Sequence, residues 1–361
     1  MNILIVKLSA IGDVVHTLPS LAALRKLYPR AHITWVIEEA AADLIKNHPL
    51  LDCVIISRRQ GWVRDLKKGR IEALGEVRHF LKELRSRQYD LVIDFHGLLK
   101  SSLLVFLTAA PRKLGFDSWQ ELSGLFLTEK VPEVLEKHAV YRYLDLVRHL
   151  ARENLLLPGS DVNEQTFSGS GNGDIEFPLP RDEAVERRVA GLLAEKGLTS
   201  GGFVAINPVA LWETKLWEDR NFALLADMLI GQYGMPVLFT GREKREIDGI
   251  RALMTREAVN LAGETSLTEL ACLYRQSALL VTTDTGPMHI AAAVGTPVVA
   301  LFGPTDPSRT GPFGQRHRVI RAELPCSPCL RKKCTHRECM RRISPEEVLL
   351  AVGDVLRNKS A

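Results

Sequence analysis

Residues 282–307 read TTDTGPMHIAAAVGTPVVALFGPTDP and decide the fold class. An apolar run ends at Asp284, and Gly286 and Pro287 then begin a helix, where proline suits the first positions. A second apolar run, VVALF, ends in the turn at residues 302–307. A strand, a helix and a second strand in this order predict a parallel sheet with helices on its faces, and both turns lie at the same sheet edge.

The first of these turns has the chemistry of a phosphate site. A helix N-terminus presents free N–H groups and a positive dipole end. Gly286 lets a ligand approach the backbone, Thr285 adds a hydroxyl, and His289 lies on the first helical turn. Asp or Thr before a helix is also a common cap in the absence of any ligand. The convergence of two such turns favours a ligand.

The same alternation extends through the whole chain and predicts two doubly wound α/β domains. A Gly-, Ser- and Pro-rich stretch at 167–183 has no periodicity and is typical of a linker between them. The predicted domains are 1–166 and 184–343, followed by a last helix within 344–361 that Ser344 caps. The predicted strands are 2–7, 32–37, 53–57 and 91–95, and further strands end within 202–208, 235–241, 258–263, 277–286 and 296–303.

Bulk composition sets the class of protein. The chain has 361 residues, of which 46% are apolar and 25% charged, with a formal net charge of +4. This composition is typical of a globular protein and does not indicate a nucleic-acid binder, although it suits a phosphate-bearing partner. The opening MNILIVK is shorter than the apolar core of a signal peptide, about 7–15 residues, and no apolar run reaches about 18 residues. We therefore expect a cytoplasmic protein.

The turn after the first strand carries an acid where a nucleotide-binding turn would be rich in glycine. Residues 8–21 read LSAIGDVVHTLPSL, with Gly12 and Asp13 at the tip of the turn and His16 three residues later. Asp13 either caps the following helix or accepts a proton from a substrate hydroxyl. The absence of G-x-G-x-x-G argues against an NAD-dependent dehydrogenase.

Basic residues gather in three further segments. Lys215 lies in the loop after a predicted strand, beside Trp217, and either contacts a phosphate or is solvated. In DFHGLLKSS (94–102), Lys100 is expected to contact a carboxylate or phosphate. Residues 58–87 hold ten Lys and Arg against four acids, a balance that attracts phosphorylated sugars, although a solvated helix face explains part of it.

Four motifs together resemble the lipopolysaccharide heptosyltransferases of glycosyltransferase family 9. They are KLSAIGDVVHTLP (7–19), DFHGLLKSS, KLW (215–217) and residues 282–307. The segments at 8–19 and 35–41 look more like heptosyltransferase I than heptosyltransferase II. The resemblance implies a GT-B fold, with two Rossmann-like domains facing a cleft and a final helix that crosses back to the first domain. It also implies transfer of heptose from ADP-heptose to the Kdo and lipid A inner core, at the cytoplasmic face of the inner membrane.

The resemblance also implies roles for individual residues. Asp13 would be the general base of an inverting transfer, and Lys215 would neutralise the departing ADP. No metal or other cofactor is needed in this scheme. An acid that meets the donor ribose in relatives falls here at Arg245, flanked by Glu243 and Glu246, and we prefer Glu246. The predicted donor residues are Asn207, Trp217, Gly241, Glu246, Asp284, Thr285, Gly286, Met288 and His289. The predicted acceptor residues are Gly12, His16, Arg58, Arg59, Trp62, His96, Gly97 and Lys100.

The six cysteines fall into two groups. Cys53 and Cys272 lie in apolar segments and are expected in the core. Cys326, Cys329, Cys334 and Cys339 are spaced C-x2-C-x4-C-x4-C, with His336 among them, which resembles a structural zinc or iron–sulfur site. Reduced thiols are the alternative. Six basic residues around this group either meet anionic lipid headgroups or are solvated.

Three rival functions follow from the same residues. A family 9 enzyme could transfer the second heptose or another sugar. A sugar-nucleotide epimerase of GT-B shape would need acids and a histidine placed for elimination and re-addition of the nucleotide. A non-catalytic sugar-nucleotide-binding protein would need neither Asp13 nor Lys215, so their presence argues against it.

Overall fold

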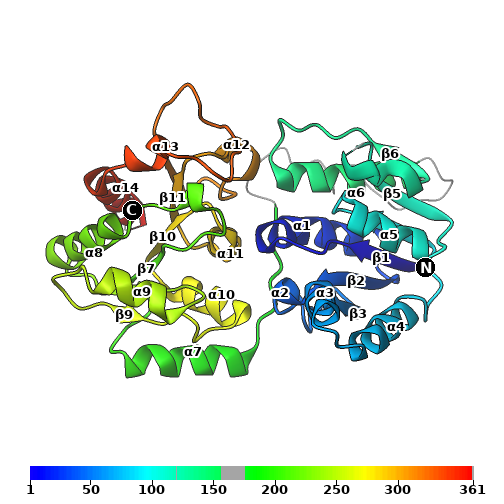
Figure 1. Cartoon of the computed structure of the whole chain (residues 1–361), viewed down its shortest axis with the longest axis horizontal. Helices are drawn as coiled ribbons and strands as arrows, with labels where there is room; N and C mark the ends of the chain where they lie inside the picture. Colours follow the sequence, from blue (N-terminus) through cyan, green and yellow to red (C-terminus); the bar gives the residue numbers. More distant parts are fainter. Residues whose placement is uncertain (119, 156–174, 360–361) are drawn as a thin grey trace. The chain divides into compact units, whose positions relative to one another are not determined.

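The computed structural model describes residues 1–118, 120–155 and 175–359. The chain divides into two compact units, residues 1–180 and 181–361 (Figure 1). Of the predicted linker at 167–183, residues 167–174 lie outside the described residues. None of the helices in the described ranges is long and apolar enough to cross a membrane.

The first unit is a parallel sheet of six strands in the order β3-β2-β1-β4-β5-β6. This is the Rossmann strand order. The four strands predicted in this half are confirmed, whereas β5 and β6 were not predicted. The strands are β1 (Asn2–Val6), β2 (His32–Glu38), β3 (Cys53–Ser57), β4 (Leu91–Asp94), β5 (Arg112–Phe116) and β6 (Glu129–Val131). The helices are α1 (Ile11–Leu27), α2 (Glu39–Ala42), α3 (Arg59–Lys67), α4 (Glu72–Leu84), α5 (Leu99–Leu107), η1 (Gln120–Phe126) and α6 (Ala139–Leu155).

The second unit repeats this architecture with the strand order β12-β11-β10-β7-β8-β9. All five strands predicted in this half are present, and β12 was missed. The strands are β7 (Val204–Asn207), β8 (Val237–Phe239), β9 (Val259–Asn260), β10 (Leu279–Thr283), β11 (Val298–Phe302) and β12 (Arg318–Arg321). The helices are α7 (Glu183–Glu195), η3 (Glu213–Lys215), α8 (Asp219–Tyr233), α9 (Lys244–Arg251), α10 (Leu267–Gln276), α11 (Gly286–Ala293), α12 (Pro307–Thr310), α13 (Glu338–Arg341) and α14 (Pro345–Lys359).

Strand register brings the polar turns of each unit to one sheet edge. In the first unit, Val6 pairs with both Val36 and Asp94, so the chain leaves β1, β2 and β4 at the same edge. In the second unit, Thr282 pairs with Asn207 and Thr283 with Leu301. The carboxyl ends of the strands are where doubly wound sheets bind ligands. The predicted site residues therefore start from a common edge within each unit.

Two helices show how apolar side chains are used in each unit. The valines of α14, Val348, Val352 and Val355, are buried in the core of the second unit, where the helix packs on α8 and on β10 to β12. The expected packing of this helix on the first domain stays a prediction. At the start of α4, Ile71 and Leu74 are exposed.

Candidate active site

Asp13 lies in the first turn of α1 and is half-buried. Its carboxylate accepts a hydrogen bond from the backbone N–H of Ala10 at 3.3 Å, which helps to cap the helix. The other carboxylate oxygen accepts the hydroxyl of Tyr143, on α6, at 3.1 Å. The capping interpretation of Asp13 is therefore correct in part. Both of these bonds come from neutral groups.

Tyr143 links Asp13 to a buried lysine that sequence reasoning missed. The Lys7 ammonium donates to the Tyr143 hydroxyl at 2.7 Å and to the carbonyl of Phe95 at 2.9 Å. Burial lowers the pKa of Lys7, while the charges of Asp13 and Asp94 oppose this shift. Burial and the Asp13 charge raise the pKa of Tyr143 well above its usual value. Tyr143 therefore keeps its proton, and its hydroxyl donates a hydrogen bond to the Asp13 carboxylate.

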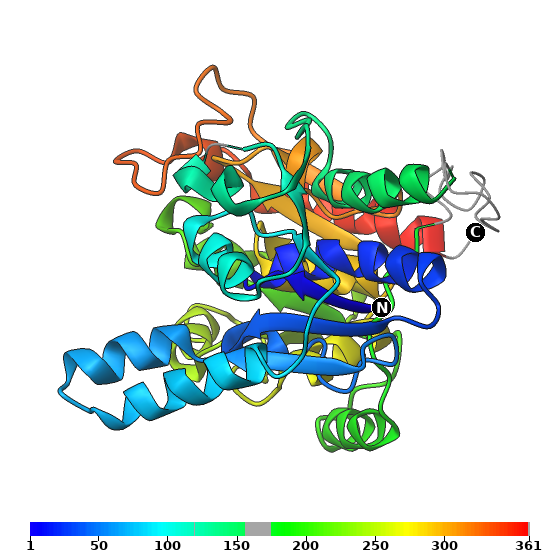
Figure 2. The same ribbon diagram turned by 90° about the vertical axis from the view of Figure 1, so that its right-hand side faces the viewer.

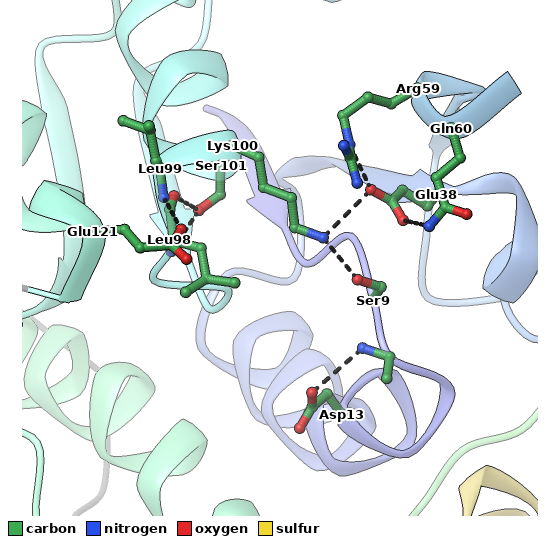
Figure 3. Close-up of polar contacts among 11 residues, drawn as sticks. Ser9, Asp13, Glu38, Arg59, Gln60, Leu98, Leu99, Lys100, Ser101 and Glu121 are labelled. Carbon is green, nitrogen blue, oxygen red and sulfur yellow. Dashed lines mark hydrogen bonds and ion pairs between the residues drawn. The ribbon is translucent and has the colours of Figure 1, made fainter. Parts of the chain in front are cut away.

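A second acid at this edge, Glu38 at the end of β2, forms ion pairs with two of the predicted acceptor cations (Figure 3). Its buried carboxylate lies 2.9 Å from Arg59 Nε and 3.4 Å from Lys100 Nζ. Lys100 also donates to the hydroxyl of Ser9 at 2.9 Å. We call Glu38, Arg59, Lys100 and Ser9 the Glu38 cluster. It joins α3, α5 and the turn before α1 at one point.

The turn after β4 is organised by Asp94, which the prediction did not include. Its buried carboxylate accepts the N–H groups of His96 at 2.8 Å and Gly97 at 3.1 Å, and the Ser101 hydroxyl at 2.8 Å. Gly97 has a φ of +64°, which glycine adopts without strain. Burial, with the charges of Lys7 and Lys100, lowers the pKa of His96 to about 3. His96 is thus neutral at neutral pH and does not act as a cation.

Several predicted acceptor residues have other roles in the structure. Trp62 is buried against Phe80, with ring centroids 5.3 Å apart, and its indole N–H donates to Glu76. His16 is buried edge-on against His138. Both rings pack against neighbouring aromatic side chains in this structure, and their roles in acceptor binding stay predictions. Two further residues were predicted to bind the acceptor. Arg58 forms ion pairs with Glu76 and Glu39, and Gly12 is buried in the first turn of α1.

In the second unit, Lys215 and Asp284 form an ion pair. Lys215 Nζ lies 2.6 Å from an oxygen of Asp284, which also accepts the Thr305 hydroxyl at 2.6 Å. The turns after β10 and β11 therefore meet, as the sequence predicted. The same Nζ lies 4.6 Å from the ring centroid of Trp212, a residue the prediction missed. Asp284 is buried, whereas the Lys215 side chain keeps 16% of its surface exposed.

The N-terminus of α11 presents Thr285 and Gly286, both half-buried. His289 is buried on the first turn, and Met288 is fully buried. The Met288 side chain is part of the core, and its contact with the donor stays a prediction.

The remaining predicted donor residues are divided between core and surface. Trp217 packs on Phe222 in the core of this unit, and its indole N–H donates to the Ile343 carbonyl. The ring stabilises the loop from inside, and its donor contact stays a prediction. Asn207 is buried and its amide donates to Thr240. Gly241 is half-buried, and Glu246 is exposed on the first turn of α9.

The C-terminal cysteines line one pocket together with His336. Within the described residues, however, the one group of three potential ligand atoms within 4.8 Å of one another is Glu129, His149 and Glu153. The four sulfur atoms thus lack the close convergence of a formed metal site. The Glu129 group is itself an ion-pair network, since Arg112 contacts both glutamates. Metal binding by the cysteines stays a prediction.

Comparisons with known proteins agree with this fold. The model of glycosyltransferase family 9 (heptosyltransferase) matches residues 77–340. The chain is 30% identical over 343 residues to lipopolysaccharide heptosyltransferase 1 of Pseudomonas aeruginosa, over 93% of this chain and 88% of that protein. It is also 30% identical over 340 residues to lipopolysaccharide heptosyltransferase 2 of Escherichia coli K12, over 89% and 88% of the two chains.

A solved structure has the same fold. The E. coli heptosyltransferase WaaC with ADP-2-deoxy-2-fluoro heptose aligns with a TM-score of 0.74 and 23% identity, over 98% of this chain and 99% of that one. Two Rossmann-like domains of the GT-B class are thereby confirmed. This chain belongs to glycosyltransferase family 9, and it is a glycosyltransferase.

Proposed function

We propose that this enzyme transfers a heptose from ADP-heptose to the Kdo-bearing inner core of lipopolysaccharide, with inversion and with Asp13 as the general base. The observation that carries the proposal is the environment of Asp13. Its carboxylate accepts hydrogen bonds from the neutral Tyr143 hydroxyl and the Ala10 N–H. The names of the two curated relatives and the donor analogue bound to WaaC support the donor and the acceptor class.

The chemical step needs one base and one stabilised leaving group. The acceptor hydroxyl oxygen forms a bond to the anomeric carbon as the bond from that carbon to the ADP oxygen breaks. The hydroxyl proton passes to the Asp13 carboxylate, and the bonding electrons leave with ADP. The Lys215 ammonium offsets the negative charge that develops on the diphosphate. All atoms and charges balance without a metal or other cofactor.

Lys7 and Tyr143 are proposed as positioning residues. The hydrogen bond from Tyr143 fixes one oxygen of Asp13 and leaves the rest of the carboxylate to accept the proton. The Lys7 ammonium, bonded to the same hydroxyl, orients the Tyr143 proton toward Asp13. This arrangement keeps the base in one orientation.

On the donor side, Asp284 holds Lys215 for the diphosphate. The pair at 2.6 Å fixes the ammonium beside the N-terminus of α11, where the backbone of Thr285 and Gly286 suits a phosphate. Trp212, whose ring lies under the ammonium, restricts Lys215 further. Glu246 is proposed to meet the ribose, since it is exposed near the end of β8.

On the acceptor side, the Glu38 cluster suits an acidic sugar. Arg59 and Lys100 both face one carboxylate, so each already occupies an orientation that binds a carboxylate. The carboxylate of Kdo has the same chemistry. Because relatives of type 1 and type 2 are equally identical to this chain, transfer of the second heptose is the alternative. The enzyme is proposed to act at the cytoplasmic face of the inner membrane.

A transfer assay tests the function. Purified enzyme is incubated with ADP-heptose and, in parallel, with Kdo-lipid A or with the same acceptor already carrying one heptose. Product with the first acceptor alone supports addition of the first heptose, and product with the second alone supports the alternative. No product with either acceptor, and no binding of ADP-heptose, would contradict the donor assignment.

A further inference from the structure

The helix pair α3 and α4 extends beyond the sheet of the first unit (Figure 2). Its far end exposes apolar side chains. One face of the pair is packed, since Trp62, Ala73 and Phe80 are buried. At the far end, Val63, Leu66, Ile71 and Leu74 expose 44%, 40%, 71% and 53% of their surface. We call residues 63–74 the helix-pair tip. Its four apolar side chains are not used by the core of the unit.

The periodicity of α4 explains this exposure. The apolar positions Val77, Leu81 and Leu84 pack on the core of the first unit, and Leu74 and Ile71 continue the same stripe toward the tip. The stripe therefore runs past the region that the sheet covers. A helix stripe that continues beyond its packed surface is typical of a second contact.

Basic residues alternate with these apolar ones. The tip contains Arg64, Lys67, Lys68 and Arg70 against two acids, Asp65 and Glu72. Asp65 lies 3.4 Å from Arg70 and 3.9 Å from Arg64, so its charge is shared between two arginines. Lys67 and Lys68 are exposed and form no ion pair within the described residues. The tip thus presents net positive charge together with apolar surface.

An anionic phospholipid bilayer satisfies both features at once. Leucine and isoleucine enter the boundary between headgroups and acyl chains, while lysine ammonium groups stay at the phosphates. Each Lys or Arg near such a surface strengthens binding by about fivefold. We infer that the helix-pair tip docks this enzyme on an anionic bilayer, with Leu66 and Ile71 inserted and Lys67 and Lys68 at the headgroups.

This inference rests on the proposed function for its biological setting, because a lipid-linked acceptor lies in a membrane. The binding itself requires neither donor nor acceptor. It can therefore be measured on vesicles that contain no lipopolysaccharide. A vesicle signal then reports the bilayer and not the acceptor.

Co-sedimentation of the full chain with vesicles tests the inference. Vesicles of phosphatidylglycerol and phosphatidylcholine are compared with vesicles of phosphatidylcholine alone. The anionic vesicles should bind at least tenfold more protein, and 0.5 M salt should remove most of the difference. The variant L66Q/I71Q should lose at least tenfold of the binding. Its matched control is L224Q/L350Q, which alters leucines of the second unit with 47% and 69% exposure.

A charge variant provides an independent arm. K67E/K68E should abolish the preference for anionic vesicles, whereas R187E/K196E, which reverses two exposed cations on or just after α7, should retain it. Circular dichroism and thermal unfolding confirm that each variant is folded. Unchanged vesicle binding by both tip variants, or equal losses in the matched controls, would overturn the inference.

Transfer to a detergent-dispersed acceptor separates this inference from the proposed function. If the tip variants keep transfer in detergent and lose vesicle binding, both proposals stand. If the wild-type protein transfers heptose in detergent yet ignores vesicles, the docking inference fails and the function remains. If it binds vesicles and transfers nothing, the function fails and the docking remains.

Discussion

Asp13 and Asp284 begin from similar positions and end in opposite environments. Each follows a central strand of a parallel sheet and lies at the start of a helix. Asp284 is buried and bound to the Lys215 ammonium at 2.6 Å. Asp13 is half-buried and accepts hydrogen bonds from a neutral hydroxyl and a backbone N–H. The same residue type thus binds an ammonium group directly in one unit and accepts hydrogen bonds from a hydroxyl and a backbone N–H in the other.

The difference shows that the partner of a carboxylate defines its role. A carboxylate bound directly to a cation is stabilised in its charged form and is a poor base. Near Asp13, the Lys7 ammonium donates to the Tyr143 hydroxyl, which in turn donates to the Asp13 carboxylate. Asp284 is therefore expected to matter for donor binding, through Lys215, and Asp13 for the chemical step.

The largest expected effect comes from Asp13→Asn. The amide keeps the size and the capping interaction of the side chain but cannot accept the acceptor proton, so kcat should fall by about a thousandfold. The dissociation constant for ADP-heptose, measured by calorimetry, should stay unchanged. A kcat within tenfold of wild type would contradict the assignment of the base.

A smaller loss of activity is expected from changes to the ion pair of Lys215 and Asp284. Lys215→Ala removes the charge that offsets the leaving diphosphate, and kcat/KM should fall by about a hundredfold.

Asp284→Asn should reduce affinity for ADP-heptose more than it reduces the single-turnover rate, because it frees Lys215 without removing it. Lys244→Ala, an exposed lysine paired with Glu264, is the control and should leave both unchanged. If Asp13→Asn and Asp284→Asn reduced the single-turnover rate equally, the proposed difference in role between the two acids would be contradicted.

The Glu38 cluster extends the comparison to the acceptor. Glu38→Gln removes the charge that holds Arg59 and Lys100, and the KM for the acceptor should rise by about tenfold through misplacement of the two cations. The neighbouring Glu39→Gln, which loses only the exposed contact to Arg58 at 3.4 Å, is the matched control. An unchanged acceptor KM in Glu38→Gln would remove this cluster from the acceptor site.

The smallest effect concerns stability and pH. His96 has a pKa of about 3 in the folded protein, below the usual value of 6.5, so the unfolded chain binds more protons between these values. Stability is therefore lost as the pH falls below 6.5, by about 2 kcal/mol at pH 5. In His96→Gln the loss between pH 7 and pH 5, measured by urea unfolding, should be smaller by that amount. His79→Gln controls for the removal of an exposed imidazole, and identical pH profiles in wild type and His96→Gln would refute the assignment.

The sequence predicted the fold well because alternation of buried strands and helices is a strong local signal. The missed strands β5, β6 and β12 are short or carry charge, as in EKV and RVIR, so they lack an apolar run. Asp13, Lys215 and Asp284 follow strands, and the family resemblance gave them their predicted roles. The contact between Lys215 and Asp284 joins residues far apart in the chain, and no local pattern encodes it.

Four of the predicted site residues have side chains buried within their units. Trp62, Trp217, His16 and Met288 lie close in sequence to polar site residues, yet their side chains point into packed interfaces. Tyr143 and Glu38 were missed for the converse reason. Tyr143 lies on α6, more than a hundred residues from Asp13, and Glu38 ends an apolar strand. Direction of a side chain is decided by tertiary packing, which residue type and spacing do not report.

The pH dependence of the transfer rate tests the central claim most directly. Single-turnover transfer from saturating ADP-heptose should slow as the pH falls in the wild-type enzyme, because protonation of Asp13 removes the base. In Asp13→Asn the residual rate should lack this acidic limb, while Asp284→Asn should keep it. An acidic limb that persists unchanged in Asp13→Asn would show that another group accepts the proton.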